Sequence, residues 1–389
     1  MRKLPSGNMM PIALNGEHGY LTVAEYLLER GAIKADRTGT GTYSRFGVVN
    51  VEYDLLADDG CATVMLPSTK NVFWDKAVVE LIWMLSGSNR LKFLIDNKVA
   101  FWNNWVKPGT EVFGRMLEQG ERFRMLKGSQ WDEMQAASEG YNDDAVRLEA
   151  QEALFKKFGI PQYQILDGDL GPVYGVQWRH WEDLRLIDPS VMYNGNAAWE
   201  QYGKRGFVHM GTADDGRLMI RREIDQIARL EKAIKERDDS AARRNVLSAW
   251  NVAYLEDMAL PPCHTLAQWG IERDATGELV LHCKLYQRSG DWFLGVPYNV
   301  AFYSIFTHML CAIYGLKAGK LFHTVGDAHV YSNHVDQVRE QLATPINEAS
   351  QPRVIIERRS YSSILDFKVE DITIDGYVPG KVINAPVAV

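Results

Sequence analysis

The strongest constraint on the fold is the uneven distribution of apolar residues along the chain. Residues 20–105 and 240–389 are rich in Trp, Tyr, Val, Ile and Leu, whereas residues 106–165 and 183–220 are rich in charged and turn-forming residues. Since 46% of the 389 residues are hydrophobic, a substantial core is possible. We therefore expect a single domain over residues 1–389 with insertions at about 106–165 and 183–220. The first insertion should form exposed helices, and the second should be loop-like.

Several segments carry a clear helix or strand pattern. Residues 76–85 (KAVVELIWML) are apolar on nearly every side of a helix, which predicts a buried helix. Residues 222–239 place apolar side chains on one stripe, which is typical of a surface helix. Strand patterns occupy residues 245–250, 264–271 and 278–289, with a hairpin turn at 272–277. This mixture predicts an α+β fold with a sizeable sheet.

Charge and composition exclude several classes of function. The net charge of −7 argues against the broad basic face that nucleic acids or anionic membranes require. No run of about 18 apolar residues occurs, and the N-terminal segment lacks a signal-peptide core. The four cysteines form no CxxC pair and the nine histidines form no ligand cluster. We therefore expect reduced thiols, no metal, and a cytoplasmic location (the host cytoplasm if a phage encodes the chain).

Cys263 lies in the segment LPPCHTLAQWG, residues 260–270. Pro261 and Pro262 restrict the backbone before the strand, as the presentation of a nucleophile requires. The alternative is a buried cysteine that acts as a small hydrophobic residue. A thiol protease is disfavoured, because neighbours on a strand point to opposite faces and His264 is badly placed as a base for Cys263.

Arginines and one glutamate are further candidates for chemistry. Each of four arginines stands beside small or turn residues and could bind phosphate, although a solvated surface arginine is the alternative. These arginines are Arg37, Arg243, Arg244 and Arg288. Glu80 is flanked by Val79 and Leu81, so desolvation should raise its pKa and suit it to proton transfer. The alternative for Glu80 is a structural role at a helix edge.

Many segments closely resemble the thymidylate synthase family, in that family's order and over nearly the whole chain outside the two insertions. They are DRTGTGT (36–42), VELIWMLSGSN (79–89), FWNNW (101–105), DLGPVYGVQWRHW (169–181), RRNVLSAWN (243–251), MALPPCHTLAQW (258–269), YQRSGDWFLGVPYN (286–299), GDAHVYSNH (326–334) and APVAV (385–389). The resemblance implies a three-layer α+β fold with a mixed sheet at a dimer interface. It also implies transfer of a one-carbon unit from 5,10-methylenetetrahydrofolate to C5 of dUMP, with no metal.

The resemblance also implies roles for particular residues. Cys263 would attack C6 of dUMP, and nearby Arg288 would favour its thiolate. The catalytic residues would be Cys263, Glu80, Tyr174, His264 and Asn299. The nucleotide would be bound by Arg37, Arg243, Arg244, Gln287, Arg288, Ser289, Asp291, Asn299, His329 and Tyr331. The folate would be bound by Trp102, Asp291, Gly295, Tyr298 and Val389. Arg243 and Arg244 would reach across from the other subunit of a homodimer. Asn299 would favour uracil, because an amide can donate to O4 and accept from N3–H at once.

Departures from the family pattern lie mainly around the expected folate. They are Asn71, Phe73, Gly290, Trp292 and Tyr298, with two asparagines between the tryptophans of FWNNW. These changes leave two products open. Quenching by hydride would give dTMP, which the intact Trp102 and APVAV tail favour because they exclude water. Quenching by water would give 5-hydroxymethyl-dUMP. A third alternative is a dUMP-binding protein without turnover.

Overall fold

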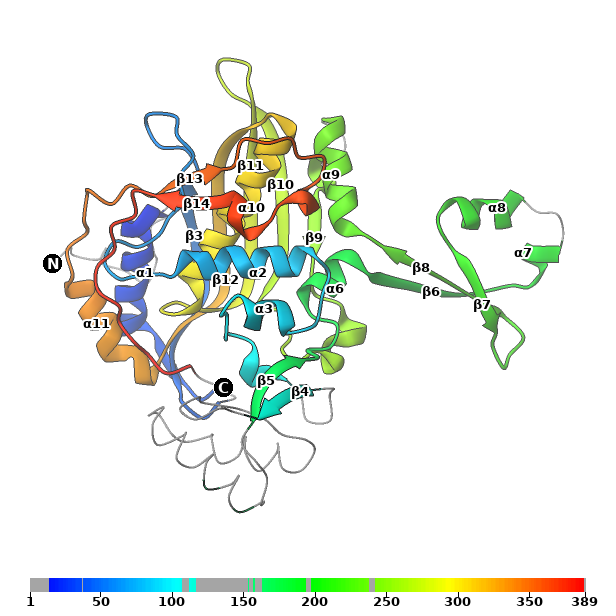
Figure 1. Ribbon diagram of the computed structural model, residues 1–389, viewed down its shortest axis with the longest axis horizontal. Helices are drawn as coiled ribbons and strands as arrows, with labels where there is room; N and C mark the ends of the chain where they lie inside the picture. Colours follow the sequence, from blue (N-terminus) through cyan, green and yellow to red (C-terminus); the bar gives the residue numbers. More distant parts are fainter. Residues whose placement is uncertain are drawn as a thin grey trace.

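A seven-stranded mixed sheet forms the centre of the computed structural model (Figure 1). The structure describes residues 14–36, 38–106, 112–116, 163–193, 197–237 and 242–387, together with Ala153 and Lys157. The sheet order is β1 (Leu14–Asn15), β3 (Thr42–Asp54), β12 (Lys317–Tyr331), β11 (Leu279–Asp291), β10 (His264–Arg273) and β9 (Val246–Ser248), with β2 (Ala32–Lys34) also paired to β3. The pairs β11–β12 and β1–β3 are parallel, and the others are antiparallel.

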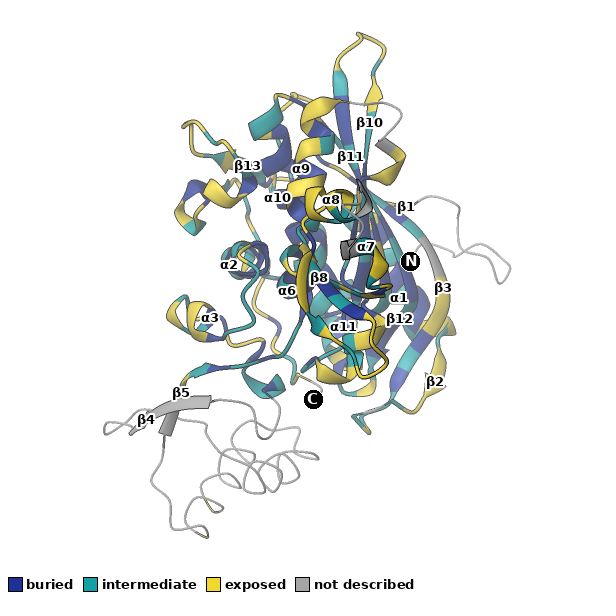
Figure 2. Cartoon of the chain, turned by 90° about the vertical axis from the view of Figure 1, so that its right-hand side faces the viewer, coloured by how far each residue is buried: buried dark blue, intermediate teal, exposed yellow. Residues whose placement is uncertain are grey.

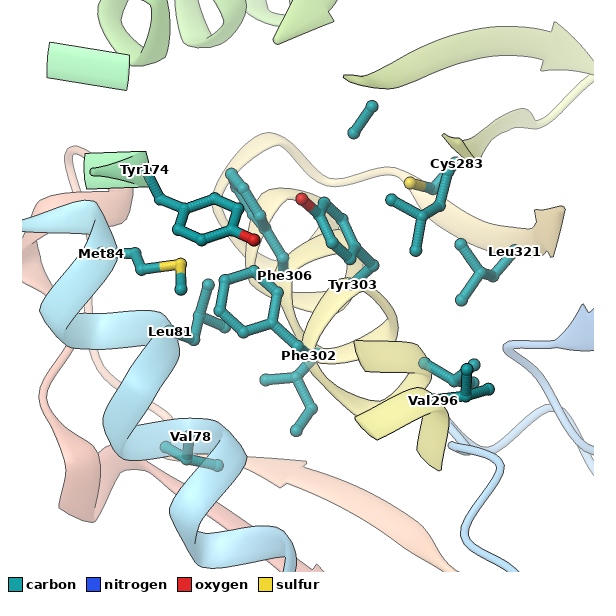
Figure 3. Close-up of a cluster of buried hydrophobic side chains, with 14 of the residues drawn as sticks. Val78, Leu81, Met84, Tyr174, Cys283, Val296, Phe302, Tyr303, Phe306 and Leu321 are labelled. Atoms are coloured by element: carbon teal, nitrogen blue, oxygen red, sulfur yellow. The ribbon is translucent and has the colours of Figure 1, made fainter. Parts of the chain in front are cut away.

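Helix α10 (Gly295–Tyr314) packs between the sheet and α2 (Trp74–Leu85) (Figure 3). Apolar and aromatic side chains from both helices and from β11 and β12 fill the space between them. Within the described residues, α10 is the one helix long and apolar enough to cross a membrane, but 78% of its apolar window is buried inside the protein. It is therefore the central helix of the core.

The remaining elements surround this core. They are α1 (Gly16–Arg30), α3 (Lys92–Asp96), α6 (Tyr174–Arg179), α9 (Gln226–Glu236), α11 (Val335–Ala343) and the hairpin of β13 (Arg353–Ile356) and β14 (Ile372–Asp375). Short 3₁₀ helices are η1 (Asn103–Trp105), η2 (Ala242–Arg244), η3 (Val252–Asp257), η4 (Ser332–His334), η5 (Ile364–Asp366) and η6 (Val369–Asp371). Helix α1 lies against β3 and α11, so it covers the sheet beside α10.

The expected helices and strands of the body are confirmed. The buried helix at 76–85 is α2, and the three strand patterns correspond to β9, β10 and β11. The surface helix at 222–239 begins later than its pattern, at Gln226, because Ile224 closes strand β8 (Leu218–Ile224). Asp225 then caps the helix by accepting a hydrogen bond from the Ala228 N–H.

The expectation that residues 183–220 are loop-like is wrong. Strands β6 (Trp181–Ile187), β8 (Leu218–Ile224) and β7 (Val208–Thr212) form a three-stranded sheet, with α7 (Ser190–Tyr193) and α8 (Ala197–Lys204) in the connection. We call residues 181–224 the arm, since they project from the body (Figure 1). Its own apolar cluster consists of Ile187, Phe207, Leu218 and Ile220. Turn residues such as Gly206 and Gly216 lie in the connections, and alternate residues of β8 supply the apolar face.

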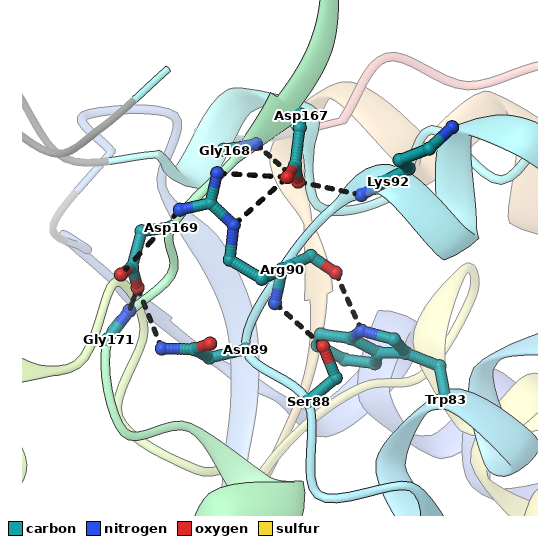
Figure 4. A network of polar contacts seen from close by, with 9 residues as sticks. All are labelled: Trp83, Ser88, Asn89, Arg90, Lys92, Asp167, Gly168, Asp169 and Gly171. Carbon is teal, nitrogen blue, oxygen red and sulfur yellow. Dashed lines mark hydrogen bonds and ion pairs between the residues drawn. The ribbon is translucent and has the colours of Figure 1, made fainter. Parts of the chain in front are cut away.

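The first insertion is anchored to the body at its base. Most of residues 106–165, including the expected helices, lie outside the described residues, but β4 (Val112–Met116) pairs with β5 (Tyr163–Gly168). At the end of β5, Asp167 accepts hydrogen bonds from Nε and Nη2 of Arg90 at 3.0 and 2.9 Å (Figure 4). Asp169 accepts from the Asn89 side chain at 2.9 Å. These contacts join β5 to the segment between α2 and α3.

Candidate active site

Cys263 is held at the entrance to β10 by three contacts. Its backbone N–H donates to the Tyr174 hydroxyl at 2.7 Å, and its carbonyl accepts from the Arg288 N–H at 2.8 Å. The Arg288 guanidinium donates to the carbonyls of Pro262 and Pro261 at 2.8 and 2.7 Å and lies 3.8 Å from the Cys263 sulfur. The thiol is half-buried, whereas Cys283 and Cys311 are buried in the core. The carbonyl groups of the two prolines therefore hold the Arg288 guanidinium beside Cys263, the one half-buried cysteine.

Glu80 lies on the core side of α2 and is 9% exposed. Its Oε1 accepts a hydrogen bond from the Trp102 indole N–H at 2.8 Å. Burial raises the pKa of Glu80 to about 7, and the Trp102 hydrogen bond acts in the opposite direction. The rise expected from the apolar neighbours of Glu80 in the sequence is therefore present, and the carboxyl can exchange a proton near neutral pH.

Aromatic rings connect Glu80 to the cysteine segment. Trp102 packs edge-on against Tyr174 with ring centroids 5.9 Å apart, and Tyr174 stacks on His264 at 4.3 Å. His264 Nδ1 hydrogen-bonds the Tyr303 hydroxyl of α10 at 2.9 Å. Burial, together with nearby His323, lowers the pKa of His264 to about 3, so the ring is neutral at physiological pH. His264 is thus fixed in the aromatic core between Tyr174 and Tyr303.

Asn299 lies in the first turns of α10, above the sheet. Its Oδ1 accepts a hydrogen bond from Nε2 of Gln287 at 2.9 Å. Gln287 Oε1 in turn accepts from Nε2 of His323 at 2.5 Å. Gln287 and His323 are each 1% exposed, so this chain of three side chains runs through the interior.

The arginines expected at the phosphate separate into three groups. Arg288 packs on Trp250 at 5.5 Å and lines a pocket of about 520 Å³, together with Ser248, Thr265, Leu266 and Tyr286. Arg243 and Arg244 are exposed on η2, and neither approaches Cys263 in any described contact of this chain. Arg37 lies outside the described residues.

The ends of β11 and β12 bring four further candidates together. Asp291 pairs in register with His329, and its Oδ1 accepts from the N–H groups of Phe293 and Leu294 at 3.1 Å each. His329 lies 5.1 Å from Tyr331 between ring centroids. Burial acts to lower the pKa of His329, but its contact with Asp327 and the charge of Asp291 raise the pKa overall. Ser289, on the same strand as Asp291, is half-exposed.

Aromatic residues gather near the N-terminus of α10. Tyr298 meets Phe101 edge-on at 5.2 Å, and its hydroxyl accepts from the Phe73 N–H at 3.4 Å. Phe73 and Phe101 are 47% and 41% exposed, so they offer flat surfaces to a planar ligand. A Cβ added at Gly295 would come within 3.6 Å of Asp291 and 3.7 Å of Asn299, which is ordinary contact. Val389 lies outside the described residues.

Two of the expected changes at the folate wall are core residues. Trp292 is 0% exposed, stacks between Tyr20 at 5.8 Å and His323 at 6.1 Å, and donates to the Tyr20 carbonyl. Gly290 is also buried, and a Cβ there would approach Val325 and Val296 within 3.2 Å. Gly290, near the end of β11, and Trp292, in the turn after it, therefore both face the packed interior. That they alter a folate-facing wall stays a prediction.

Two residues of this region were missed from the sequence. Tyr303 orients His264, and His323 begins the chain that ends at Asn299. A signal for His323 exists, since it stands between Leu321 and Val325 on the inward-facing side of an alternating strand. Among the described residues, no group of three His, Cys, Asp or Glu side chains could hold a metal ion.

Comparisons with known proteins agree on one family. A model of the family described as thymidylate synthase matches residues 18–389. The chain is 34% identical over 381 residues to a thymidylate synthase of Listeria monocytogenes serotype 4b (strain CLIP80459), covering 95% of this chain and 99% of that protein. It is 35% identical over 379 residues to a thymidylate synthase of Listeria innocua serovar 6a, with the same coverage.

Proposed function

Because the chain belongs to the thymidylate synthase family, we propose that the residues around Cys263 carry out that family's reaction in the roles given below. The chain is an enzyme, a methyltransferase that reductively methylates dUMP to dTMP. Family membership implies 5,10-methylenetetrahydrofolate as the co-substrate, which supplies both the one-carbon unit and the hydride. The single observation that carries the proposal is the placement of Arg288 and Tyr174 around Cys263.

Cys263 acts as the nucleophile that adds to C6 of dUMP. The guanidinium 3.8 Å from its sulfur stabilises the thiolate, which is the reactive form. Tyr174 holds the backbone of Cys263, and the two prolines limit its movement. The addition makes C5 nucleophilic, so C5 can bond to the one-carbon unit. Elimination of Cys263 later restores the aromatic base.

Glu80 transfers protons during these steps. A carboxyl group whose pKa is about 7 can both donate and accept near neutral pH. Trp102 fixes its position by donating to Oε1, and Tyr174 and His264 extend the same packed layer toward the nucleotide. Because His264 is neutral, it contributes hydrogen-bonding without adding charge beside the pyrimidine.

Asn299 selects the pyrimidine, with Gln287 beside it. Its amide donates to O4 and accepts from N3–H, a pattern that uracil presents and cytosine does not. Arg37, Arg288 and Ser289 bind the phosphate. His329, Tyr331 and Asp291 complete the nucleotide site at the ends of β11 and β12, and the neighbouring rings of His329 and Tyr331 support their joint action on the ribose hydroxyl.

The folate binds against Trp102, Asp291, Gly295 and Tyr298, with Val389 closing over it. The exposed aromatic surface of Phe73 and Phe101 beside Tyr298 supports stacking of a planar ring there. Because Trp292 and Gly290 pack into the core, they give no reason to expect water to replace hydride. The observations therefore favour closure around the intermediate and methylation.

A homodimer completes each site with Arg243 and Arg244 of the second subunit. Both arginines are exposed, and strands of the central sheet carry the exposed apolar residues Phe46, Val246 and Tyr286, as an interface requires.

The chain is a single domain with insertions near 106–165 and 183–220. The cytoplasm, with its reduced thiols, is the location that suits a free catalytic cysteine.

The test of the proposed function is product analysis. Purified protein is incubated with dUMP and 5,10-methylenetetrahydrofolate, and the nucleotide product is weighed by mass spectrometry while dihydrofolate is followed by absorbance. We expect dTMP and an equal amount of dihydrofolate. A product heavier by one oxygen, formed without dihydrofolate, would contradict methylation, and no product would contradict the assigned catalytic residues.

A further inference from the structure

A side-chain amide recognises uracil only if its orientation is fixed. In one orientation, Nδ2 of Asn299 donates to O4 and Oδ1 accepts from N3–H of uracil. Turned by 180°, the same side chain accepts from the amino group of cytosine and donates to its N3. The two orientations have nearly the same shape, so packing alone distinguishes them poorly. Some neighbouring group must determine which end of Asn299 is the donor.

Gln287 makes the contact that orients Asn299. Its Nε2 donates to Asn299 Oδ1 at 2.9 Å, which places the oxygen of Asn299 on the Gln287 side. Gln287 is itself an amide that could be turned, so it transmits an orientation without deciding one. Its Oε1 bonds to Nε2 of His323 at 2.5 Å. An amide oxygen can only accept, so Nε2 of His323 must carry the hydrogen.

The surroundings of His323 keep this hydrogen on Nε2. Burial, together with the charge of Lys284, lowers the pKa of His323 to about 3, so the ring is neutral and carries a single N–H. Nδ1 of His323 has no hydrogen-bond partner among the described residues. A buried N–H without a partner is rarer and less favourable than a bare lone pair. The neutral ring therefore places its hydrogen where Gln287 can accept it.

Strand register and stacking hold the three side chains in line. His323 of β12 pairs with Leu285 of β11, and Gln287 lies two residues farther along the same face. The His323 ring lies parallel to Trp292 at 6.1 Å, with an angle of 13° between the planes. Tyr53 packs on it at 6.5 Å. A ring held between aromatic neighbours cannot readily turn over to exchange its two nitrogens.

We propose that His323 is a positioning residue for pyrimidine selection, which sets Gln287 and thereby the donor end of Asn299 toward O4 of uracil. His323 touches neither substrate nor reacting atoms in this arrangement. The inference rests on the proposed role of Asn299 and adds the residue that fixes its direction. It also accounts for a polar side chain at an inward-facing strand position that nothing in the reaction uses directly.

The test compares two substitutions of His323. His323→Gln retains an N–H near the position of Nε2, whereas His323→Phe retains a ring and removes the donor. For each variant, the dissociation constants of dUMP and dCMP are measured by calorimetry, along with kcat and KM for dUMP. We expect His323→Phe to lower the preference for dUMP over dCMP by about tenfold or more, mainly through dUMP binding and KM. His323→Gln should retain most of the wild-type preference.

A second measurement reads the tautomer of His323 directly in the wild-type enzyme. In wild-type enzyme labelled with ¹⁵N-histidine, the ring nitrogens of His323 report its tautomer, and His323→Gln identifies the signal. We expect the Nε2–H form with and without dUMP. An Nδ1–H tautomer, or an unchanged dUMP preference in folded His323→Phe, overturns the inference. Asn299→Asp distinguishes failure of this inference from failure of the proposed role of Asn299. If Asn299→Asp also leaves the dUMP preference unchanged, the proposed role of Asn299 fails. If only His323→Phe leaves that preference unchanged, the role of Asn299 stands and the inference about His323 fails.

Discussion

The region around Cys263 and the arm of residues 181–224 are built in opposite ways. Most candidate site residues lie on or next to α2, α6, β10, β11, β12 and α10, and these elements contribute to one continuous apolar core. The arm has a separate small cluster centred on Phe207, and most residues of β6 and β7 are exposed or intermediate (Figure 2). In the region around Cys263, the packing of each core residue helps to position several candidate site residues. In the arm, the apolar cluster stabilises mainly the arm.

The junction between the two regions is polar. Arg179 pairs with Asp225 at 2.8 Å, His180 contacts Glu223 at 3.0 Å, and the Tyr254 hydroxyl donates to Glu182. Such contacts at partly exposed positions transmit little energy compared with a shared apolar core. We therefore expect substitutions in the body to alter chemistry and stability together, and substitutions in the arm to alter only the arm.

The largest effect is expected from Cys263→Ala. Removing the nucleophile should lower kcat by at least about 10³-fold, because binding alone cannot replace covalent activation. The adduct with 5-fluoro-dUMP and methylenetetrahydrofolate, detected by mass spectrometry, should disappear while dUMP still binds. Cys283→Ala is the matched control, since this buried cysteine of the same core should affect stability and leave turnover. An active Cys263→Ala enzyme would refute the mechanism.

Glu80→Gln should lower kcat by about 10²- to 10⁴-fold, the range for loss of a general acid–base group. The control is Glu231→Gln, because Glu231 is equally buried at 9% but bonds the hydroxyls of Tyr314 and Ser363 away from the site. Steady-state kinetics and thermal unfolding of both variants separate the two roles. If both variants lose stability and only Glu80→Gln loses turnover, the role of Glu80 in proton transfer holds. Equal losses of turnover in the two variants would contradict that role.

Acidification should destabilise the body before the arm. His264, His323 and His308 have pKa values lowered by burial to about 3, 3 and 4, so below about pH 6.5 the unfolded chain binds protons that the native chain does not. Each histidine should lower the unfolding free energy by about 1.4 kcal/mol per pH unit in that window. Glu80, whose pKa is raised, offsets one of them between about pH 7 and 4.5.

The arm has the opposite kind of group. Hydrogen bonds from Arg185 and Arg222 lower the pKa of Asp183, so its stabilising pairs persist until the pH falls below its ordinary value of 3.8. Urea unfolding of the body at pH 7 and pH 5, compared with hydrogen exchange of β8 amides, measures the difference. A body whose unfolding free energy is unchanged between these values would show that the buried histidines are not neutral in the native state.

The smallest effect on activity is expected from Phe207→Ala in the arm. Truncating a buried phenylalanine typically costs about 3–5 kcal/mol, but here the loss should appear as local opening of the arm. Faster hydrogen exchange in β6–β8 with unchanged kcat and KM is the expected result. Phe302→Ala, which truncates a buried ring packed on Trp178 and His264, should lower both global stability and kcat. A Phe207→Ala variant with reduced kcat would show that the arm and the site are coupled.

The structural features that could be predicted from the sequence depend on residues that lie close together along the chain. The period of α2 and the turn between β10 and β11 depend on neighbouring residues, so their patterns are readable. The two prolines before Cys263 favoured a presented cysteine, and the thiol is half-buried. Local residue patterns singled out Cys263, Glu80 and the four arginines, and the other candidate site residues came from a family resemblance.

Tertiary structure decided the features that depend on register and packing between distant segments. The arm strands pair only because β8 returns beside β6 some thirty residues later along the chain, and no local pattern announces this. Gly290 faces the core because β11 pairs with β12, and Trp292, just after β11, stacks between Tyr20 and His323. The bond from Trp102 to Glu80 and the chain from His323 through Gln287 to Asn299 each join separate elements. The sequence contains these polar side chains, but only the packing of the helices on the central sheet brings them within hydrogen-bonding distance.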